Sequence, residues 1–130
     1  MVTSLNNRPA ARDFGYESAQ YICARIQANA GGATVNKSVG MIPAGALVVN
    51  IYTRVATIFA GGTPALVVGS NSPAFNNLAN PAEAQGSEDL MPLATFANPL
   101  TADTEIFASL SGGATSGDAY VAVQFLKPLA

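Results

Sequence analysis

The residues that could do acid–base or nucleophilic chemistry in this 130-residue chain are few and widely spaced. The chain has no histidine, which excludes a Ser-His-Asp triad, a Cys-His dyad and histidine-ligated zinc or haem. The single cysteine, Cys23, excludes an intrachain disulfide and a four-cysteine metal site. No general base stands near Cys23 in the sequence, so we expect a small, half-buried strand residue rather than a nucleophile.

The acidic residues do not form a pair suited to catalysis or metal binding. Glu88 and Asp89 are adjacent and would face opposite ways on a strand, whereas a glycosidase needs two carboxylates that flank one cleft. Asp103 and Glu105 would share a face, but a calcium ion needs six to eight oxygen ligands. We interpret them as solvated charges at a strand end. The sequence thus predicts no enzyme, no metal and no cofactor.

Charged residues are only 11% of the chain, against about 25% in typical soluble proteins. Uncharged polar groups cost less to desolvate than ions, so such a surface suits a protein that packs against neighbours. Many extracellular β-domains share this composition. The six basic residues form no cluster, which predicts no nucleic-acid partner. We expect neither a membrane-spanning helix nor a signal peptide, because no long apolar run exists and residues 1–14 lack an apolar core.

Apolar residues alternate with polar ones along several segments, which predicts half-buried strands. The strand over 47–59 follows a Pro43-Ala44-Gly45 turn and exceeds the usual strand length, so we expect a bend near 53–56. We place Gly61 and Gly62 in a hairpin connection, since neither a helix nor Lys-Ser/Thr follows them as in a phosphate loop. The predicted strands cover 21–28, 33–39 (an edge strand), 47–59, 65–68, 104–110 and 119–127. Within the predicted strand over 47–59, the residues expected to face the core are Leu47, Val49, Ile51, Thr53, Val55, Thr57 and Phe59.

Residues 71–92 form the least regular internal segment, with three prolines and four asparagines between Asn71 and Pro92. We interpret this segment as a long surface loop under which Phe75 and Leu78 tuck. A single helical turn over residues 74–78 and a loop that contacts a partner are the alternatives. The four tyrosines are dispersed along the sequence, so a sugar-binding platform receives only weak support.

The pattern as a whole predicts an all-β fold: an antiparallel, two-sheet, jelly-roll-like sandwich, with an immunoglobulin-like sandwich as the alternative. We expect one β-domain over residues 20–130 and an extended N-terminal arm over residues 1–19. The arm is either a disordered terminus or a segment that orders against a partner. Phe14 and Tyr16 would share one face of an extended arm. The candidate partner contacts are Arg8, Arg12, Phe14, Tyr16 and Phe75.

Two segments resemble small structural proteins of tailed-bacteriophage heads. The first is VGMIPAGALVVNIYTRVATIFAGGTPALVV, from Val39 to Val68, in which a Pro-Ala-Gly turn opens a long hydrophobic strand. The second is GDAYVAVQFL, from Gly117 to Leu126, which is similar to their last strand. The resemblance covers about half of the chain and does not separate cement proteins from head fibres. It implies a β-domain that clamps neighbouring major capsid subunits from outside, and it carries no catalytic residues.

Composition and resemblance together predict a non-enzymatic capsid cement or decoration protein on the virion exterior. The expected partners are the major capsid protein and further copies of the chain, as a dimer or trimer, without nucleic acid or membrane. A carbohydrate-binding or adhesin-type module, such as a head fibre, is the alternative. A minor hydrolase is disfavoured by the absence of histidine and of a carboxylate pair.

Overall fold

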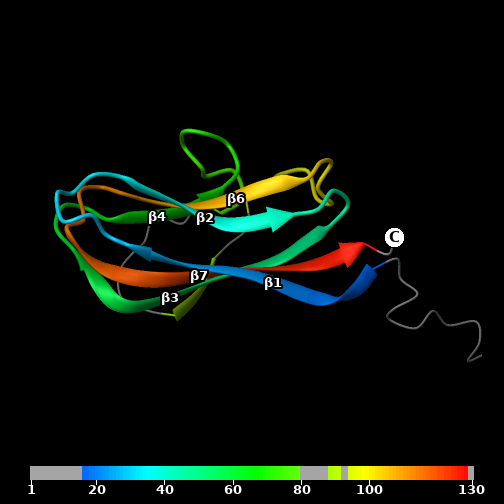
Figure 1. The fold of residues 1–130 in the computed structure, drawn as a ribbon, viewed down its shortest axis with the longest axis horizontal. Coiled ribbons are helices and arrows are strands. Elements are labelled where there is room, and N and C mark those ends of the chain that lie inside the picture. Colours follow the sequence, from blue (N-terminus) through cyan, green and yellow to red (C-terminus); the bar gives the residue numbers. More distant parts are fainter. Residues whose placement is uncertain (1–15, 80–87, 92–93, 129–130) are drawn as a thin grey trace, which may run out of the picture.

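Two antiparallel β-sheets stack face to face in the computed structural model, which describes residues 16–79, 88–91 and 94–128 (Figure 1). The strand order is β1-β7-β3-β5 in one sheet and β2-β6-β4 in the other. The strands are β1 (Tyr16–Gln27), β2 (Val35–Ile42), β3 (Leu47–Ala60), β4 (Ala65–Gly69), β5 (Glu88–Met91), β6 (Thr104–Ser111) and β7 (Ser116–Pro128). The predicted all-β, two-sheet antiparallel sandwich is confirmed.

Consecutive strands alternate between the two sheets, so no strand is hydrogen-bonded to its neighbour in sequence among those described. The immunoglobulin-like alternative is therefore wrong, because that fold pairs consecutive strands within a sheet. The hairpin predicted at Gly61-Gly62 is wrong for the same reason, since this connection crosses from one sheet to the other. The jelly-roll version of the sandwich stays a prediction, because a jelly roll has eight strands and seven are described.

Strand β1 begins at Tyr16, opposite Pro128 at the end of β7. Residues 16–19, which the sequence assigned to the arm, therefore belong to the four-stranded sheet. Residues 1–15 of the predicted arm lie outside the described part of the chain.

The core lies between the sheets and is formed by the apolar faces that alternation predicts in β6 and β7. Ile106, Ala108 and Leu110 of β6 are buried, and they belong to the same core cluster as the buried residues of β7. The predicted inner face of β1 is also confirmed, with Ile26 buried and Ile22 and Ala24 packed against the core. The buried residues of β7 are Ala119, Val121, Val123 and Phe125.

Strand β3 does not keep the single inner face that strict alternation predicts. Its register with β7 shifts between Val48 and Asn50, and Val48 is buried where Leu47 and Val49 were expected to be. A β-bulge inserts one residue, so the core-facing residues change parity across it. Ile51 and Phe59 beyond the bulge are buried as predicted. A second shift, between residues 55 and 57, begins within the predicted bend at 53–56.

The segment after β4 folds back over the outer face of the three-stranded sheet (Figure 1). Phe75 is buried with its ring centroid 4.6 Å from that of Phe107, and Leu78 is fully buried. Ala79 forms a β-bridge with Val68 at the open edge of β4. Residues 74–78 form no helical turn, and the loop interpretation is confirmed for the described residues up to 79. Strand β5, which pairs with residues 51–54 of β3, was not predicted.

Glycines allow the β3–β4 connection and the β6–β7 connection to contact each other at one end of the sandwich. The amide of Thr63 donates to the carbonyl of Gly112 at 2.8 Å. Gly112 has φ +92°, and a Cβ on it would overlap the Thr63 carbonyl oxygen. Gly62 faces the Gly112 carbonyl in the same way. These glycines thus serve close backbone approach, not phosphate binding.

Candidate functional site

The neighbouring acids Asp103 and Glu105 accept hydrogen bonds from other segments of the chain. Asp103 accepts from the backbone amide of Ala44 at 2.8 Å, and Glu105 accepts from the Ser38 hydroxyl at 2.8 Å. Both carboxylates are exposed, as expected of solvated charges at a strand end. Within the described residues, no three His, Cys, Asp or Glu side chains gather where they could hold a metal ion. Glu88 and Asp89 lie on the short strand β5.

Cys23 is exposed, and the predicted half-burial is wrong. It lies on the outer side of β1, whose single hydrogen-bonded neighbour among the described strands is β7. The residue opposite it on β7 is Ala122, whose methyl group is too small to cover a neighbouring side chain.

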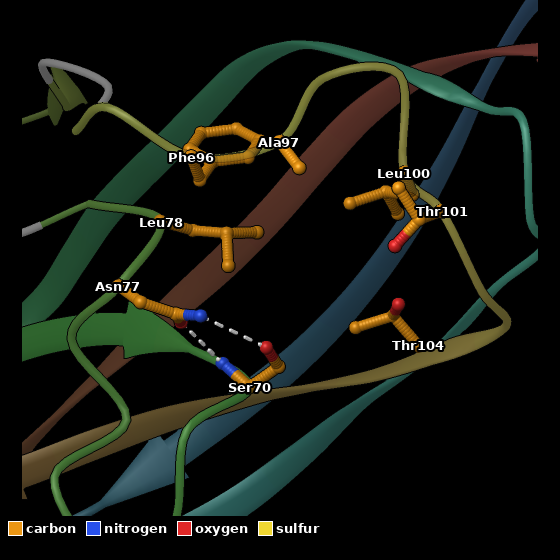
Figure 2. A pocket seen from close by; sticks show the side chains of 8 residues that line it. All are labelled: Ser70, Asn77, Leu78, Phe96, Ala97, Leu100, Thr101 and Thr104. Carbon is orange, nitrogen blue, oxygen red and sulfur yellow. Dashed lines mark hydrogen bonds between the residues drawn. The ribbon is translucent and has the colours of Figure 1, made fainter.

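A cavity of about 180 Å³ lies between the 70–78 segment and the 96–104 connection (Figure 2). Leu78 and Leu100 point into it from opposite sides. Three of its polar residues are hydrogen-bonded within the protein: the Ser70 amide donates to Asn77 Oδ1 at 2.7 Å, and the Thr104 hydroxyl donates to the Ala102 carbonyl at 2.7 Å. Ligand pockets usually measure about 300–1,000 Å³ and hold convergent polar groups. This cavity is a packing gap between two connections.

Among the side chains that the structure describes, the exposed tyrosines lie on the outer side of the four-stranded sheet, which we call the tyrosine face. Register pairs place its residues in three rows across β1, β7 and β3. Tyr21, Tyr52 and Tyr120 are 59%, 37% and 41% exposed, and they come from three different strands. The rows are Tyr21–Gln124–Asn50, Cys23–Ala122–Tyr52 and Arg25–Tyr120–Arg54.

Hydrogen bonds and a cation–π contact hold the side chains of the tyrosine face in place. Gln124 Oε1 accepts from Asn50 at 2.9 Å and from the Tyr52 hydroxyl at 3.3 Å. The Arg25 guanidinium carbon lies 6.0 Å from the centre of the Tyr120 ring. Tyr52 and Tyr120 occupy adjacent strands and adjacent rows, so they are diagonal neighbours about 7–8 Å apart. The face therefore presents ordered aromatic side chains.

An ion pair borders the tyrosine face and neutralises one of its charges. Arg25 donates from Nε to Asp118 Oδ2 at 2.7 Å, and its Nη2 lies 2.5 Å from the same oxygen. The hydrogen bond from Arg25 lowers the pKa of Asp118, and a hydrogen bond with Thr57 lowers this pKa further. Asp118 in turn raises the pKa of Arg25. The pair thus remains ionised and brings no net charge to the face.

We expect Asp118→Asn to lower the melting temperature at neutral pH and to reduce its acid dependence. Because the pKa of Asp118 is lower in the folded chain than its ordinary 3.8, its stabilisation is fully present above that value. The stabilisation is lost as the pH falls from 3.8 through the lowered pKa. Melting curves from neutral pH to below pH 3.8 should therefore show a wild-type advantage that shrinks in acid. A difference that is constant with pH would contradict this role of Asp118.

Of the predicted contact residues, the described part of the chain includes only Tyr16 and Phe75. Arg8, Arg12 and Phe14 lie outside the described residues, and Tyr16 opens β1. Phe75 is only 8% exposed, so its ring is not at the surface of this chain. The tyrosine face was missed because Tyr21, Tyr52 and Tyr120 are far apart in sequence. One signal was present, since each of them alternates with apolar residues and so lies on the outer side of its predicted strand.

The described residues hold no helix with the length and apolar character that crossing a membrane requires. No family model matches the sequence, and no curated relative matches it.

Solved structures of two bacteriophage capsids contain chains of similar fold. A chain of the cyanophage Pam1 capsid asymmetric unit superposes with a TM-score of 0.66 and 22% identity, over 98% of both chains. A chain of the acid-stable capsid of Helicobacter pylori bacteriophage KHP30 gives a TM-score of 0.62 and 13% identity, over 88% of this chain and 91% of that one. The chain therefore has a fold found in bacteriophage capsids, and the resemblance drawn from its sequence is confirmed at the level of the fold.

Proposed function

We propose that this chain is a non-enzymatic structural protein of a bacteriophage virion, a cement or decoration protein that binds and stabilises the outer surface of the major capsid shell. The observation that carries the proposal is the likeness to a Pam1 capsid chain over 98% of both chains. Two capsid structures with the same fold make a structural role in the virion the best-supported one. The low charge of the chain agrees with a surface that neighbours cover.

The tyrosine face is the surface that we propose for docking on the shell. Tyrosine and arginine dominate the binding energy of protein interfaces, because they bury a large area and still make hydrogen bonds. Tyr52 and Tyr120 lie centrally on this face, and Arg25 beside them is already neutralised by Asp118. Covering the face therefore buries aromatic area without isolating the charge of Arg25.

Co-sedimentation with expanded, DNA-free heads of the phage that encodes the chain tests this function. The protein is mixed with purified heads, the heads are pelleted, and bound protein is quantified against its concentration. We expect saturable binding in a fixed ratio to the major capsid protein, and heads that resist heat better when loaded. A protein that never pellets with the heads does not have this role.

The N-terminal segment is proposed as a second contact, through Arg8, Arg12 and Phe14. An arm that orders on docking loses conformational entropy but reaches across the seam between two subunits. Because β1 begins at Tyr16, the deletion that tests it removes residues 1–15 and leaves the sheet intact. We expect this deletion to leave the melting temperature within a few degrees of the full chain and to weaken binding to heads about tenfold. Equal affinity with and without residues 1–15 would refute the contact.

Glycan binding is the second candidate function, and the tyrosine face favours it. Sugar rings stack on exposed aromatic side chains, and three exposed tyrosines lie on one side of one sheet. Such a protein would be a head fibre or adhesin-type module of the virion. A glycan array separates the two candidates: binding to one glycan class that is lost in Tyr52→Ala supports the adhesin, and silence across the array removes it.

A further inference from the structure

From Ala19 to Gln27, the free edge of β1 lacks the features that prevent pairing at the other sheet edges of the described chain. Proteins protect exposed strand edges with short strands, lysine, proline, bulges or a covering segment. Strand β2 carries Lys37 and a register shift between residues 38 and 40. Strand β4 has five residues and is bridged by Ala79, and β5 has only four residues, of which two are acidic.

Strand β1 has twelve residues and contains neither lysine nor proline. Its register with β7 is continuous from Ala19 to Gln27, and no described residue pairs with its other side. Arg25, the one charge within the continuous segment, is bound to Asp118. Along its inner side, Ile22 and Ala24 are only half-buried. A second strand beside them would cover this apolar rim.

We propose that the free edge of β1 pairs with β1 of a second copy of this chain, in an antiparallel, two-fold symmetric dimer. The two four-stranded sheets would join into one sheet of order β5-β3-β7-β1-β1-β7-β3-β5. A two-fold axis perpendicular to a sheet keeps each side chain on its own side of that sheet. The two tyrosine faces therefore become one continuous surface, which binds a repeating shell through two sites at once.

In a two-fold symmetric dimer, both copies use the same residues of β1, and the axis passes near the middle of the paired strands. Residues that face each other across an antiparallel pair lie on the same side of the sheet, so the axis must pass beside one residue that faces its own copy. An axis at Cys23, the middle residue of the segment that continues from Ala19 to Gln27, gives the longest overlap of that segment. Cys23 of each copy then lies at or next to the axis, on the exposed side.

The size of this contact predicts a reversible dimer. A seam of nine residues, from Ala19 to Gln27, is about 30 Å long and about 10 Å high, which covers about 300 Å² on each copy. That is less than half of a standard contact of about 800 Å² per partner, although the seam would form on the order of ten backbone hydrogen bonds. The dimer should therefore dissociate on dilution, and binding of both copies to a shell would stabilise it.

Sedimentation equilibrium of the full chain without capsids tests this dimer, and its result does not depend on the proposed role in the virion. We expect a monomer–dimer equilibrium in the wild type. Cys23→Lys and Cys23→Glu each place two like charges across the seam, and each should raise the dimer dissociation constant at least tenfold. An equimolar mixture of the two variants should restore a dimer, because the facing charges are then opposite. Gln124→Lys, on the same face but one strand away from the seam, is the matched control and should leave the equilibrium unchanged.

Several results would overturn the proposal. If the wild-type protein stays monomeric at every concentration, β1 does not pair with a second copy of the chain. A trimer would exclude the two-fold seam. A dimer that tolerates both charges at position 23 uses a different surface. A dimer broken by Cys23→Lys and Gln124→Lys alike stacks face to face, and a mixture of the two charge variants that stays monomeric contradicts pairing across β1.

Discussion

Replacing Tyr52 and Tyr120 together by alanine is expected to weaken binding to phage heads about five-hundredfold or more. Large aromatic side chains at the centre of an interface each contribute about 2 kcal/mol or more, and about 1.4 kcal/mol is a tenfold change in affinity. Both rings are more than one-third exposed in the isolated chain, so their removal leaves no cavity in the core. The variant should keep its fold, with a melting temperature a few degrees lower from lost cross-strand contacts. Co-sedimentation gives the affinity, and thermal denaturation reports the fold.

Met41→Ala is the matched control for the tyrosine variant. Met41 is 57% exposed on the outer side of the other sheet, so its removal takes away apolar surface of similar exposure from the opposite side of the molecule. We expect head binding within about twofold of the wild type. If Met41→Ala weakens binding and the double tyrosine variant does not, the shell is bound by the three-stranded sheet.

Phe59→Ala is expected to have the largest effect on stability, a loss of about 3–5 kcal/mol in the free energy of unfolding. Phe59 is fully buried near the end of β3, and its ring lies against Gly117, where an added Cβ would come within 2.8 Å of Phe59 Cδ1. The glycine leaves room for the ring, and the backbone around it cannot collapse into the space left by alanine. For a chain of this length the loss corresponds to about 10–20 °C in melting temperature. Calorimetry or denaturant unfolding measures it.

The neighbouring substitution Ile58→Ala provides the control, because Ile58 is exposed on the same strand. Its expected cost is about 0.5 kcal/mol, from lost strand propensity and little lost burial. Equal losses at positions 58 and 59 would mean that Phe59 does not pack as described.

Alternation in the sequence predicted those strands whose two sides differ clearly in polarity. In β6 and β7 every second residue is apolar, and the predicted inner faces are the buried ones. Strand β3 is apolar on both sides around residues 47–51, so alternation could not locate the bulge that shifts its register after Val48. Strand β5 has four residues, and two adjacent acids in a segment with three prolines gave no strand pattern. It becomes a strand by pairing with β3, which is a contact between distant segments.

The candidate site could not be predicted from the sequence, because it depends on which strands are neighbours. Tyr21 and Tyr120 are 99 residues apart, yet they lie on adjacent strands because β1 pairs with β7. The burial of Phe75 likewise depends on Phe107, which comes from a different strand.

The most direct test of the central claim is a cryo-electron microscopy reconstruction of heads saturated with the wild-type protein. The account predicts density for the β-sandwich on the outer surface of the shell, with Tyr52 and Tyr120 against a major capsid subunit. Density in which the tyrosine face points to solvent, or heads that carry no added density at saturating protein, would contradict it.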